Sequence, residues 1–339
     1  MLGFALSLLH AWFACSAPPG FDRGPQPLDL SRWRNKRLMV IGGHPDDAEV
    51  FAGGTLATLG ELNLNITLAF LVVTSGNAGG QCYNASGFQP PEYECEREEL
   101  AFIRRQEMKA AAKFLGAAEV WRCGFDDGML ISYHESAVRE KISAYVRHFR
   151  PHIILTHQPN PNFHTPPTCN GECKYGWNDA GYHPDHQKVG WHVLNACYGG
   201  GSSSDNNMLF GELTEVGGLQ RWQPEELYFF AFSRQQPMTH YVSLSNASIW
   251  RKCEAFAKHR TQIGDTPVEL LCEWMKGVSS QIAQEAVGGA AVVQESAADW
   301  GLAKSEDSLF ASAMSAFMSR TRHLKESSVQ YAEGFQGFY

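Results

Sequence analysis

The sequence predicts an α/β fold: a Rossmann-like, mostly parallel sheet with helices on both faces, in a single domain. Apolar runs at 38–41 and 66–73 alternate along the chain with segments of helical pattern. These runs are apolar throughout, which is typical of strands buried on both faces of a parallel sheet. The chain has 339 residues, of which 44% are hydrophobic, so it can bury a large core.

The first two strand–helix units are read from apolar runs and from the residues that end them. Residues 38–41 form a strand, and the pattern predicts a helix over 53–62. The apolar run 66–73 predicts the second strand. Helix-forming residues fill 96–115, and Gly116 is a favourable residue just after a helix.

The same alternation continues through the middle of the chain. A short strand is expected at 119–122, followed by a helix at 135–149. A strand at 153–157 then leads into a long loop, 158–182, rich in Pro, Asn and Gly. A loop of that length inside a compact domain is usually functional or disordered. It leads into a helix predicted at 184–196.

The last third of the chain has a weaker pattern. Strands are expected at 227–232 and 241–244, and the remainder reads as mostly helical. The formal net charge is −8, with no run of Lys or Arg, so nucleic acid is not an expected partner.

The first residues resemble a secretory signal. Residues 1–17 are apolar and end in small residues, and they are too short for a typical membrane span. We therefore expect a signal at 1–17, a lead-in at 18–36 and one catalytic domain at 37–339. No membrane span is expected in the mature chain.

Cysteines and glycosylation sequons agree with secretion. Removing 1–17 would leave eight cysteines, an even number that suits disulfides in an oxidising compartment. Cys82 with Cys95 and Cys253 with Cys272 are plausible local pairs. Three Asn-x-Ser/Thr sequons begin at Asn65, Asn84 and Asn246. The expected location is outside the cell or in the lumen of the secretory pathway.

Two histidine-carboxylate motifs follow predicted strands. The first is HPDD at 44–47 and the second is HPDH at 183–186. Ligands bind at the carboxyl ends of the strands in open α/β sheets, so we expect the two motifs to meet there. Imidazole and carboxylate are the ligands of catalytic zinc, which leaves one position for water. Two histidines and one carboxylate would bind the metal, a second carboxylate would take a proton, and a third histidine would face the substrate carbonyl.

Two plainer readings compete with a metal site. A single His-Pro-Asp segment is often a simple turn, and in the first motif Asp46 or Asp47 could cap the following helix. Two copies at equivalent junctions make that reading less favourable. Phosphate binding by Gly42, Gly43 and the glycines at 53–54 is a second reading, but G-x-G-x-x-G is absent and two carboxylates would repel phosphate.

With these motifs in order, the sequence resembles the LmbE/PIG-L family of zinc-dependent N-acetylglucosaminyl deacetylases. The resemblance runs from about Leu38 to the segment 331–335. Its segments are HPDDAE at 44–49, GGT at 53–55, TSGNAGG at 74–80, RRQE at 104–107, GFDDG at 124–128 and HPDH at 183–186.

The resemblance implies a role for each residue of the two motifs. His44, Asp47 and His186 would bind Zn²⁺, and Asp46 would be the general base. His183 would polarise the acetyl carbonyl, with Asp185 orienting it. One position departs from the family's pattern: a tyrosine often lies two residues before the second motif, where this chain has Gly181, followed by Tyr182. A tyrosine contact to the intermediate is therefore in doubt.

Several further residues have both a functional and a structural reading. Trp177 could stack on a sugar ring or simply pack in its loop. Asp127, with Asp126, could bind sugar hydroxyls or form a turn. Arg104 could contact substrate, although an ion pair with Glu107 at i and i+3 is the plainer reading. His157 and His259 could each be an ordinary buried histidine.

The sequence therefore predicts a secreted zinc hydrolase that removes acetyl groups from an N-acetylated amino sugar, as a small molecule or an oligosaccharide. Two alternatives remain open. One is a secreted, metal-containing carbohydrate-binding protein without turnover. The other is an amidase that acts on a non-sugar N-acyl substrate.

Overall fold

A computed structural model describes most of the chain. The described residues are 24–84, 87–88, 95–159, 183–198, 218–231, 238–287 and 331–338. They form an eight-stranded sheet in the order β1-β9-β10-β8-β7-β2-β3-β6, together with a small β4–β5 hairpin. The predicted signal at 1–17 lies outside the described residues.

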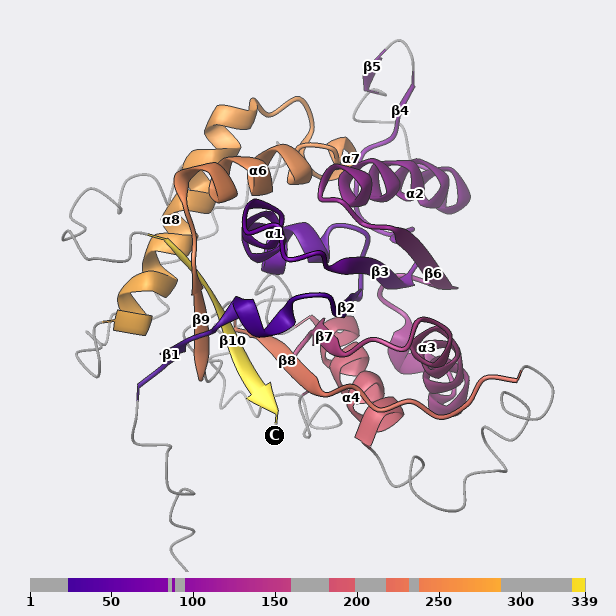
Figure 1. Cartoon of the computed structure of the whole chain (residues 1–339). Helices are drawn as coiled ribbons and strands as arrows, with labels where there is room; N and C mark the ends of the chain where they lie inside the picture. The colour runs from indigo at the N-terminus through magenta and orange to yellow at the C-terminus, as the bar shows by residue number, and fades with distance from the viewer. Residues whose placement is uncertain are drawn as a thin grey trace, which may run out of the picture.

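Five parallel strands form the centre of the large sheet (Figure 1). Read from the β6 edge, they follow the order third, second, first, fourth and fifth along the chain, so the direction of winding reverses between β2 and β7. A ligand is expected at such a reversal. These strands are β2 (Arg37–Gly42), β3 (Thr67–Thr74), β6 (Glu119–Phe125), β7 (Ile153–Thr156) and β8 (Glu226–Ala231).

The remaining strands extend the sheet beyond β8. Strand β10 (Ala332–Phe338) runs antiparallel to β8 and to β9 (His240–Ser243). Strand β1 (Gln26–Pro27) pairs in parallel with β9. The hairpin consists of β4 (Tyr83–Asn84) and β5 (Gly87–Phe88).

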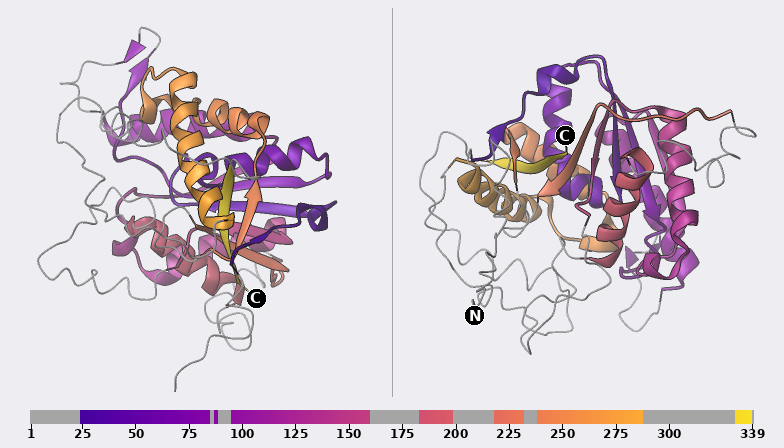
Figure 2. Two further views of the ribbon diagram at one scale, coloured as in Figure 1. Left: turned by 90° about the vertical axis from the view of Figure 1, so that its left-hand side faces the viewer. Right: turned by 90° about the horizontal axis from the view of Figure 1, so that it is seen from below.

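Helices cover both faces of the sheet (Figures 1 and 2). Strand β2 shows why: Leu38 and Val40 point into one buried cluster, whereas Met39 and Ile41 point into the other. The first face carries α1 (Asp47–Glu61), α2 (Arg97–Phe114), α6 (Asn246–Phe256), α7 (Arg260–Ile263) and α8 (Val268–Val287). The second face carries α3 (Glu135–Phe149) and α4 (Pro184–Tyr198). The predicted fold class is confirmed.

Helix α1 begins six residues earlier than the glycine pair suggested. It starts at Asp47, because Phe51 and its neighbours are buried against the sheet and hold this first part in place. The Glu333 carboxylate accepts hydrogen bonds from the N–H groups of Gly54 and Thr55, where the sequence predicted the helix to start. The glycine pair at 53–54 therefore marks the place where Glu333 contacts the backbone inside the helix, and the helix starts earlier.

Strand β10 corrects the expectation that the C-terminal part is mostly helical. Its glycines hide the two-residue alternation of a strand, and glycine disfavours both strands and helices. Pairing with two neighbouring strands and complete burial of Ala332 and Phe335 decide its structure.

Within the described residues the chain forms the disulfides Cys82–Cys95 and Cys253–Cys272, as the local pairing suggested. Cys123 and Cys197 are buried free thiols, so the even number of cysteines does not mean that all eight are paired. Burial raises the pKa of each thiol to about 12. Two 3₁₀ turns, η1 (Leu30–Trp33) and η2 (Leu130–Ser132), complete the described elements.

Among the described helices, none combines the length and the apolar character that crossing a bilayer would require.

Candidate metal centre and active site

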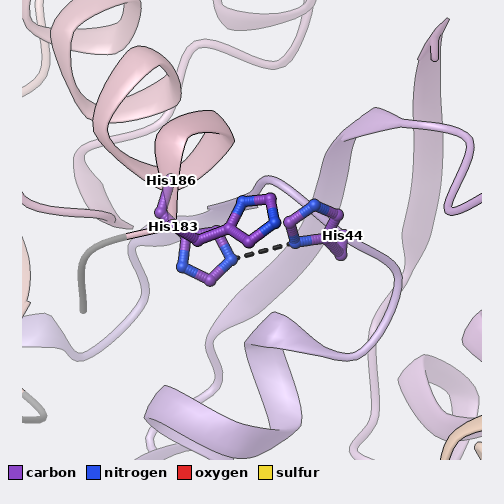
Figure 3. A group of neighbouring side chains, drawn as sticks. All are labelled: His44, His183 and His186. Atoms are coloured by element: carbon purple, nitrogen blue, oxygen red, sulfur yellow. Dashed lines mark hydrogen bonds between the residues drawn. The ribbon is translucent and has the colours of Figure 1, made fainter. Parts of the chain in front are cut away.

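The two histidine-carboxylate motifs meet at the carboxyl edge of the sheet. His44 lies in the turn that connects β2 to α1, and Asp47 is the first residue of α1. His183 immediately precedes α4, and His186 lies in its first turn. Figure 3 shows the rings of His183 and His186 projecting from the start of α4 toward His44. The fold thus brings together residues about 140 positions apart.

The three proposed metal ligands form a compact, buried trio. His44 Nδ1 lies 2.9 Å from His186 Nε2, which lies 3.2 Å from Asp47 Oδ1. His44 Nδ1 is also 3.7 Å from Asp47 Oδ2. All three residues are less than a tenth exposed. Their donor atoms therefore face one small region.

This spacing fits a bound metal ion. Zinc with nitrogen and oxygen ligands at about 2.0–2.2 Å in a tetrahedron separates its ligand atoms by roughly 3.3 Å. The separations of His186 Nε2 from His44 Nδ1, 2.9 Å, and from Asp47 Oδ1, 3.2 Å, lie close to that value. Two imidazoles and one carboxylate are also the chemical types that a catalytic divalent ion takes.

The electrostatics around His44 also favour a cation. Its Nε2 lies 3.0 Å from Asp127 Oδ1 and 3.4 Å from Asp185 Oδ2. Burial alone would lower the pKa of His44, but these two carboxylates and Asp47 raise it to about 10. The excess of negative charge is what a divalent cation would neutralise.

Asp47 is held in its ionised form. Burial by itself would raise the pKa of this carboxyl, but His186 and His157 keep the pKa well below its usual 3.8. Its Oδ2 accepts a hydrogen bond from the His44 backbone N–H over 2.7 Å. An ionised carboxylate with fixed oxygens is suited to metal binding.

Asp46 lies beside the trio but belongs to a different contact. Its Oδ1 accepts a hydrogen bond from Arg104 Nη2 over 3.0 Å. Arg104 is nearly fully buried, and its Nη1 donates to the backbone oxygen of Gly76. The predicted ion pair between Arg104 and Glu107 is therefore wrong. Both Arg104 and Glu107 point inward, but toward different partners, and Glu107 accepts hydrogen bonds from Thr261.

His183 lies next to both metal-ligand histidines. Its ring centroid is 4.6 Å from that of His44 and 5.0 Å from that of His186. Burial first, and then the fields of His44 and His186, lower the pKa of His183 to about 4, so the ring is neutral near pH 7. Its Nδ1 accepts the backbone N–H of Asp185 over 3.2 Å, which leaves the ring proton on Nε2.

Asp185 contacts His183 differently from the prediction. The expected contact was through the carboxylate, but only the backbone N–H reaches the His183 ring. The carboxylate accepts hydrogen bonds from the N–H groups of Gly128 and Leu130, over 2.7 and 3.2 Å. Asp185 is completely buried, so it ties the loop after β6 to the metal centre.

The predicted substrate contacts have different outcomes. Asp127 lies in the site, with Oδ1 near His44 and Oδ2 3.5 Å from Arg104 Nη1. Asp126 lies further out, half exposed, where it accepts hydrogen bonds from Asn77 and Tyr133. Trp177 lies outside the described residues, so its stacking role stays a prediction.

His157 belongs to the site, although the sequence gave it no clear role. It follows β7, and its Nε2 lies 2.8 Å from Asp47 Oδ2. Its ring stacks on His186 at 3.8 Å between centroids, with 9° between the planes. One signal pointed to it: a histidine directly after the strand that neighbours β2 must end at the same edge as His44.

His259 is buried on the far side of α1. Its Nε2 lies 3.3 Å from Glu49 Oε2, and both residues are completely buried. Together with the contact between Thr261 and Glu107, this pair attaches the segment containing α7 to α1 and α2.

Comparison with known proteins identifies relatives for most of the chain. Residues 39–197 match the family model described as GlcNAc-PI de-N-acetylase, PIG-L. A diacetylchitobiose deacetylase from Thermococcus kodakarensis is 25% identical over 244 residues, which cover 72% of this chain and 76% of the relative.

Two solved structures share the fold. One is the N,N'-diacetylchitobiose deacetylase from Pyrococcus horikoshii: TM-score 0.57, 19% identity, 89% of this chain and 84% of that chain. The other is GalB, the 4-carboxy-2-hydroxymuconate hydratase from Pseudomonas putida: TM-score 0.53, 17% identity, 90% of this chain and 96% of that chain. At these identities the likeness concerns the fold, which serves more than one chemistry. The stretch that matches the PIG-L family model, 39–197, spans both histidine-carboxylate motifs.

Proposed function

We propose that this protein is a zinc-dependent N-deacetylase that removes the acetyl group from an N-acetylglucosamine-type sugar or its conjugate. The single observation that carries this proposal is the arrangement of the two motifs. His44, Asp47 and His186 form a trio of suitable spacing, and Asp46 lies beside it with a different partner. The family match and the deacetylase relative support this reaction more specifically than the shared fold does.

Zinc bound by His44, Asp47 and His186 would supply a Lewis acid and a water of lowered pKa. Asp46 accepts the proton that the attacking water loses. Arg104 holds the Asp46 carboxylate in place with a charge-assisted hydrogen bond. The resulting base is close to the metal ligands, while remaining free to take a proton.

His183 acts on the substrate side. Its neutral ring has one N–H, on Nε2, which is a donor for the acetyl oxygen as that oxygen gains negative charge. The bond between the carbonyl carbon and nitrogen then breaks, and a proton passes to the leaving nitrogen. The products are acetate and a free amino sugar.

Asp127 and Arg104 would contact the sugar. Asp127 lies 3.0 Å from the metal-ligand candidate His44, and Arg104 lies 3.5 Å from Asp127. Both carry polar atoms that suit hydroxyl groups. Trp177 is proposed to stack on a sugar ring. The PIG-L family description and the chitobiose relative both concern N-acetylglucosamine compounds, which supports this substrate class.

Acetate release by the purified, zinc-loaded protein tests the function. N-acetylglucosamine, diacetylchitobiose and a GlcNAc-inositol compound are suitable substrates, with Asp46→Asn as control. We expect release by the wild type and loss of at least 99% of it in the variant. Equal release by both proteins would overturn the role of Asp46. No release from any of the sugars, with zinc bound, would favour a non-sugar N-acyl substrate or a binding protein.

We also propose that the protein enters the secretory pathway and is glycosylated there. Asn65, Asn84 and Asn246, the first residues of the three sequons, are all exposed. The two disulfides are consistent with an oxidising compartment. Expression in a eukaryotic host, followed by enzymatic removal of N-glycans, should lower the mass of the secreted protein. An unmodified protein that retains residues 1–17 inside the cell would contradict this proposal.

A further inference from the structure

One histidine that the proposed mechanism does not use contacts two of the three proposed metal ligands. His157 Nε2 lies 2.8 Å from Asp47 Oδ2, and the His157 ring stacks on His186. His157 is only 3% exposed. A buried imidazole with contacts to two ligands is placed to act on both.

The contact with Asp47 defines which atom carries the proton. Two groups approach His157 Nε2: the Asp47 carboxylate at 2.8 Å and the Gly43 backbone N–H at 3.2 Å. One tautomer can satisfy only one of them. The carboxylate contact is shorter and involves a charge, and such hydrogen bonds are roughly twice as strong as neutral ones. Nε2–H therefore donates to Asp47 Oδ2.

The ring has little freedom to leave this position. Phe51 and Phe230 meet it edge to face, with centroid distances of 5.1 and 5.2 Å. The planar contact with His186 completes an enclosure of three rings. A hydrogen-bond donor fixed in this way fixes its acceptor in turn.

His157 is not placed to be a metal ligand together with His186. The lone pair of an imidazole nitrogen lies in the plane of its ring. The two rings are 9° from parallel and 3.8 Å apart, so their in-plane lone pairs do not converge on one point. Asp47 and His186 are different, since their donor atoms are 3.2 Å apart and face one region.

We propose that His157 is a positioning residue of the metal centre. It occupies Oδ2 of Asp47, which leaves Oδ1 for the ion, and its ring fixes the orientation of His186. Partners of this kind typically contribute 10-fold to 100-fold to metal affinity. This inference rests on the proposed metal site, but it concerns metal affinity and is independent of which substrate is used.

A matched pair of variants separates the two contacts. His157→Phe keeps an aromatic ring against His186 and removes the N–H, whereas His157→Gln keeps an N–H donor and removes the ring. His192→Phe is the control, because His192 is also buried in the described part of the protein but takes no part in the metal trio. Zinc affinity is measured by competition with a chromophoric chelator, and the melting temperature is recorded for each metal-free variant.

We expect His157→Phe to weaken zinc binding 10-fold to 100-fold, His157→Gln to recover part of that loss, and His192→Phe to bind like the wild type. Unchanged affinity in both His157 variants would overturn the proposal. If His157→Phe fails to fold, His157→Gln and His157→Ala decide: the proposal requires weaker zinc binding in the alanine variant than in the glutamine variant.

Cobalt spectra distinguish positioning from direct binding. In the Co²⁺-loaded protein, His157→Gln should keep the intensity of the visible absorption bands, because the ligand set is unchanged. A change in intensity that indicates a different coordination number would make His157 a ligand and overturn the proposal. Failure of the deacetylase assay, with the affinity pattern as expected, would contradict the proposed function and leave the role of His157 intact.

Discussion

Arg104 donates a hydrogen bond from Nη2 to Asp46 Oδ1 over 3.0 Å, between helix α2 and the turn after β2. The same guanidinium contacts the backbone oxygen of Gly76 and lies 3.5 Å from Asp127 Oδ2. The proposed general base is thus oriented by a side chain that α2 carries to the site. The flat guanidinium can reach several acceptors at fixed angles, which an ammonium group cannot do.

The first prediction concerns this arginine. Arg104→Lys should lower kcat at least 10-fold, because a lysine keeps the positive charge but cannot hold Asp46 and Gly76 together. Bound zinc should stay near one equivalent, since Arg104 contacts none of the proposed ligands. Steady-state kinetics and metal analysis check this. A wild-type kcat in a folded Arg104→Lys variant would show that Asp46 needs no such support.

The second prediction separates the base from the ligands. Asp46→Asn should keep zinc and lose 10²-fold to 10⁴-fold in kcat, the usual contribution of a positioned base. His186→Ala should lose zinc together with activity, because it removes one of three donors. Metal content of the two dialysed variants is the deciding measurement. Loss of zinc from Asp46→Asn would place Asp46 among the ligands.

The third prediction concerns a buried ion pair between β10 and α6, whose carboxylate also accepts hydrogen bonds from α1. Glu333 lies 2.6 Å from Lys252 Nζ and accepts the N–H groups of Gly54 and Thr55, and both side chains are nearly fully buried. Glu333→Ala leaves these donors without an acceptor, so the free energy of unfolding should fall by about 3–5 kcal/mol. Urea denaturation measures this fall.

A double variant provides the control for that pair. Lys252→Met combined with Glu333→Ala should be less destabilising than the sum of the single changes, because the buried ammonium is then absent as well. Additive effects would show that the two side chains do not stabilise each other.

The fourth prediction concerns pH. Burial, assisted by Lys188, lowers the pKa of His192 to about 4, from an ordinary value of 6.5. Between these values the unfolded chain binds a proton that the folded protein does not. His192 therefore favours folding fully above pH 6.5, and this contribution is lost as the pH falls toward 4. The loss is at most about 3 kcal/mol.

Comparison with a variant isolates that contribution, because His157 and His183 also have pKa values lowered to about 4. We expect the unfolding free energy of His192→Phe to fall less steeply between pH 6.5 and 4 than that of the wild type. Urea titrations at several pH values measure both slopes. If the unfolding free energies of the two proteins ran parallel with pH, His192 would bind its proton equally well in the folded protein and in the unfolded chain.

The local pattern predicted the parallel centre of the fold well and its edge poorly. The strands at 38–41, 66–73 and 153–157 were predicted because strands buried on both faces are apolar at every position. Strand β10 has glycine at two of its seven positions, and its own residues do not favour a strand. Only pairing with β8 and β9, which lie about 100 residues earlier, makes it one.

The fold class, and the two motifs whose residues surround the candidate metal centre, can be read from the order of residues along the chain. Both depend on local patterns. Apolar runs form buried strands, and polar residues directly after a strand lie at its carboxyl end. Which atoms meet was decided only by the tertiary structure. The contacts of Arg104 with Asp46 and of His157 with Asp47 join residues 58 and 110 positions apart. Such contacts depend on strand order and on helix orientation, and no local pattern of residues encodes either.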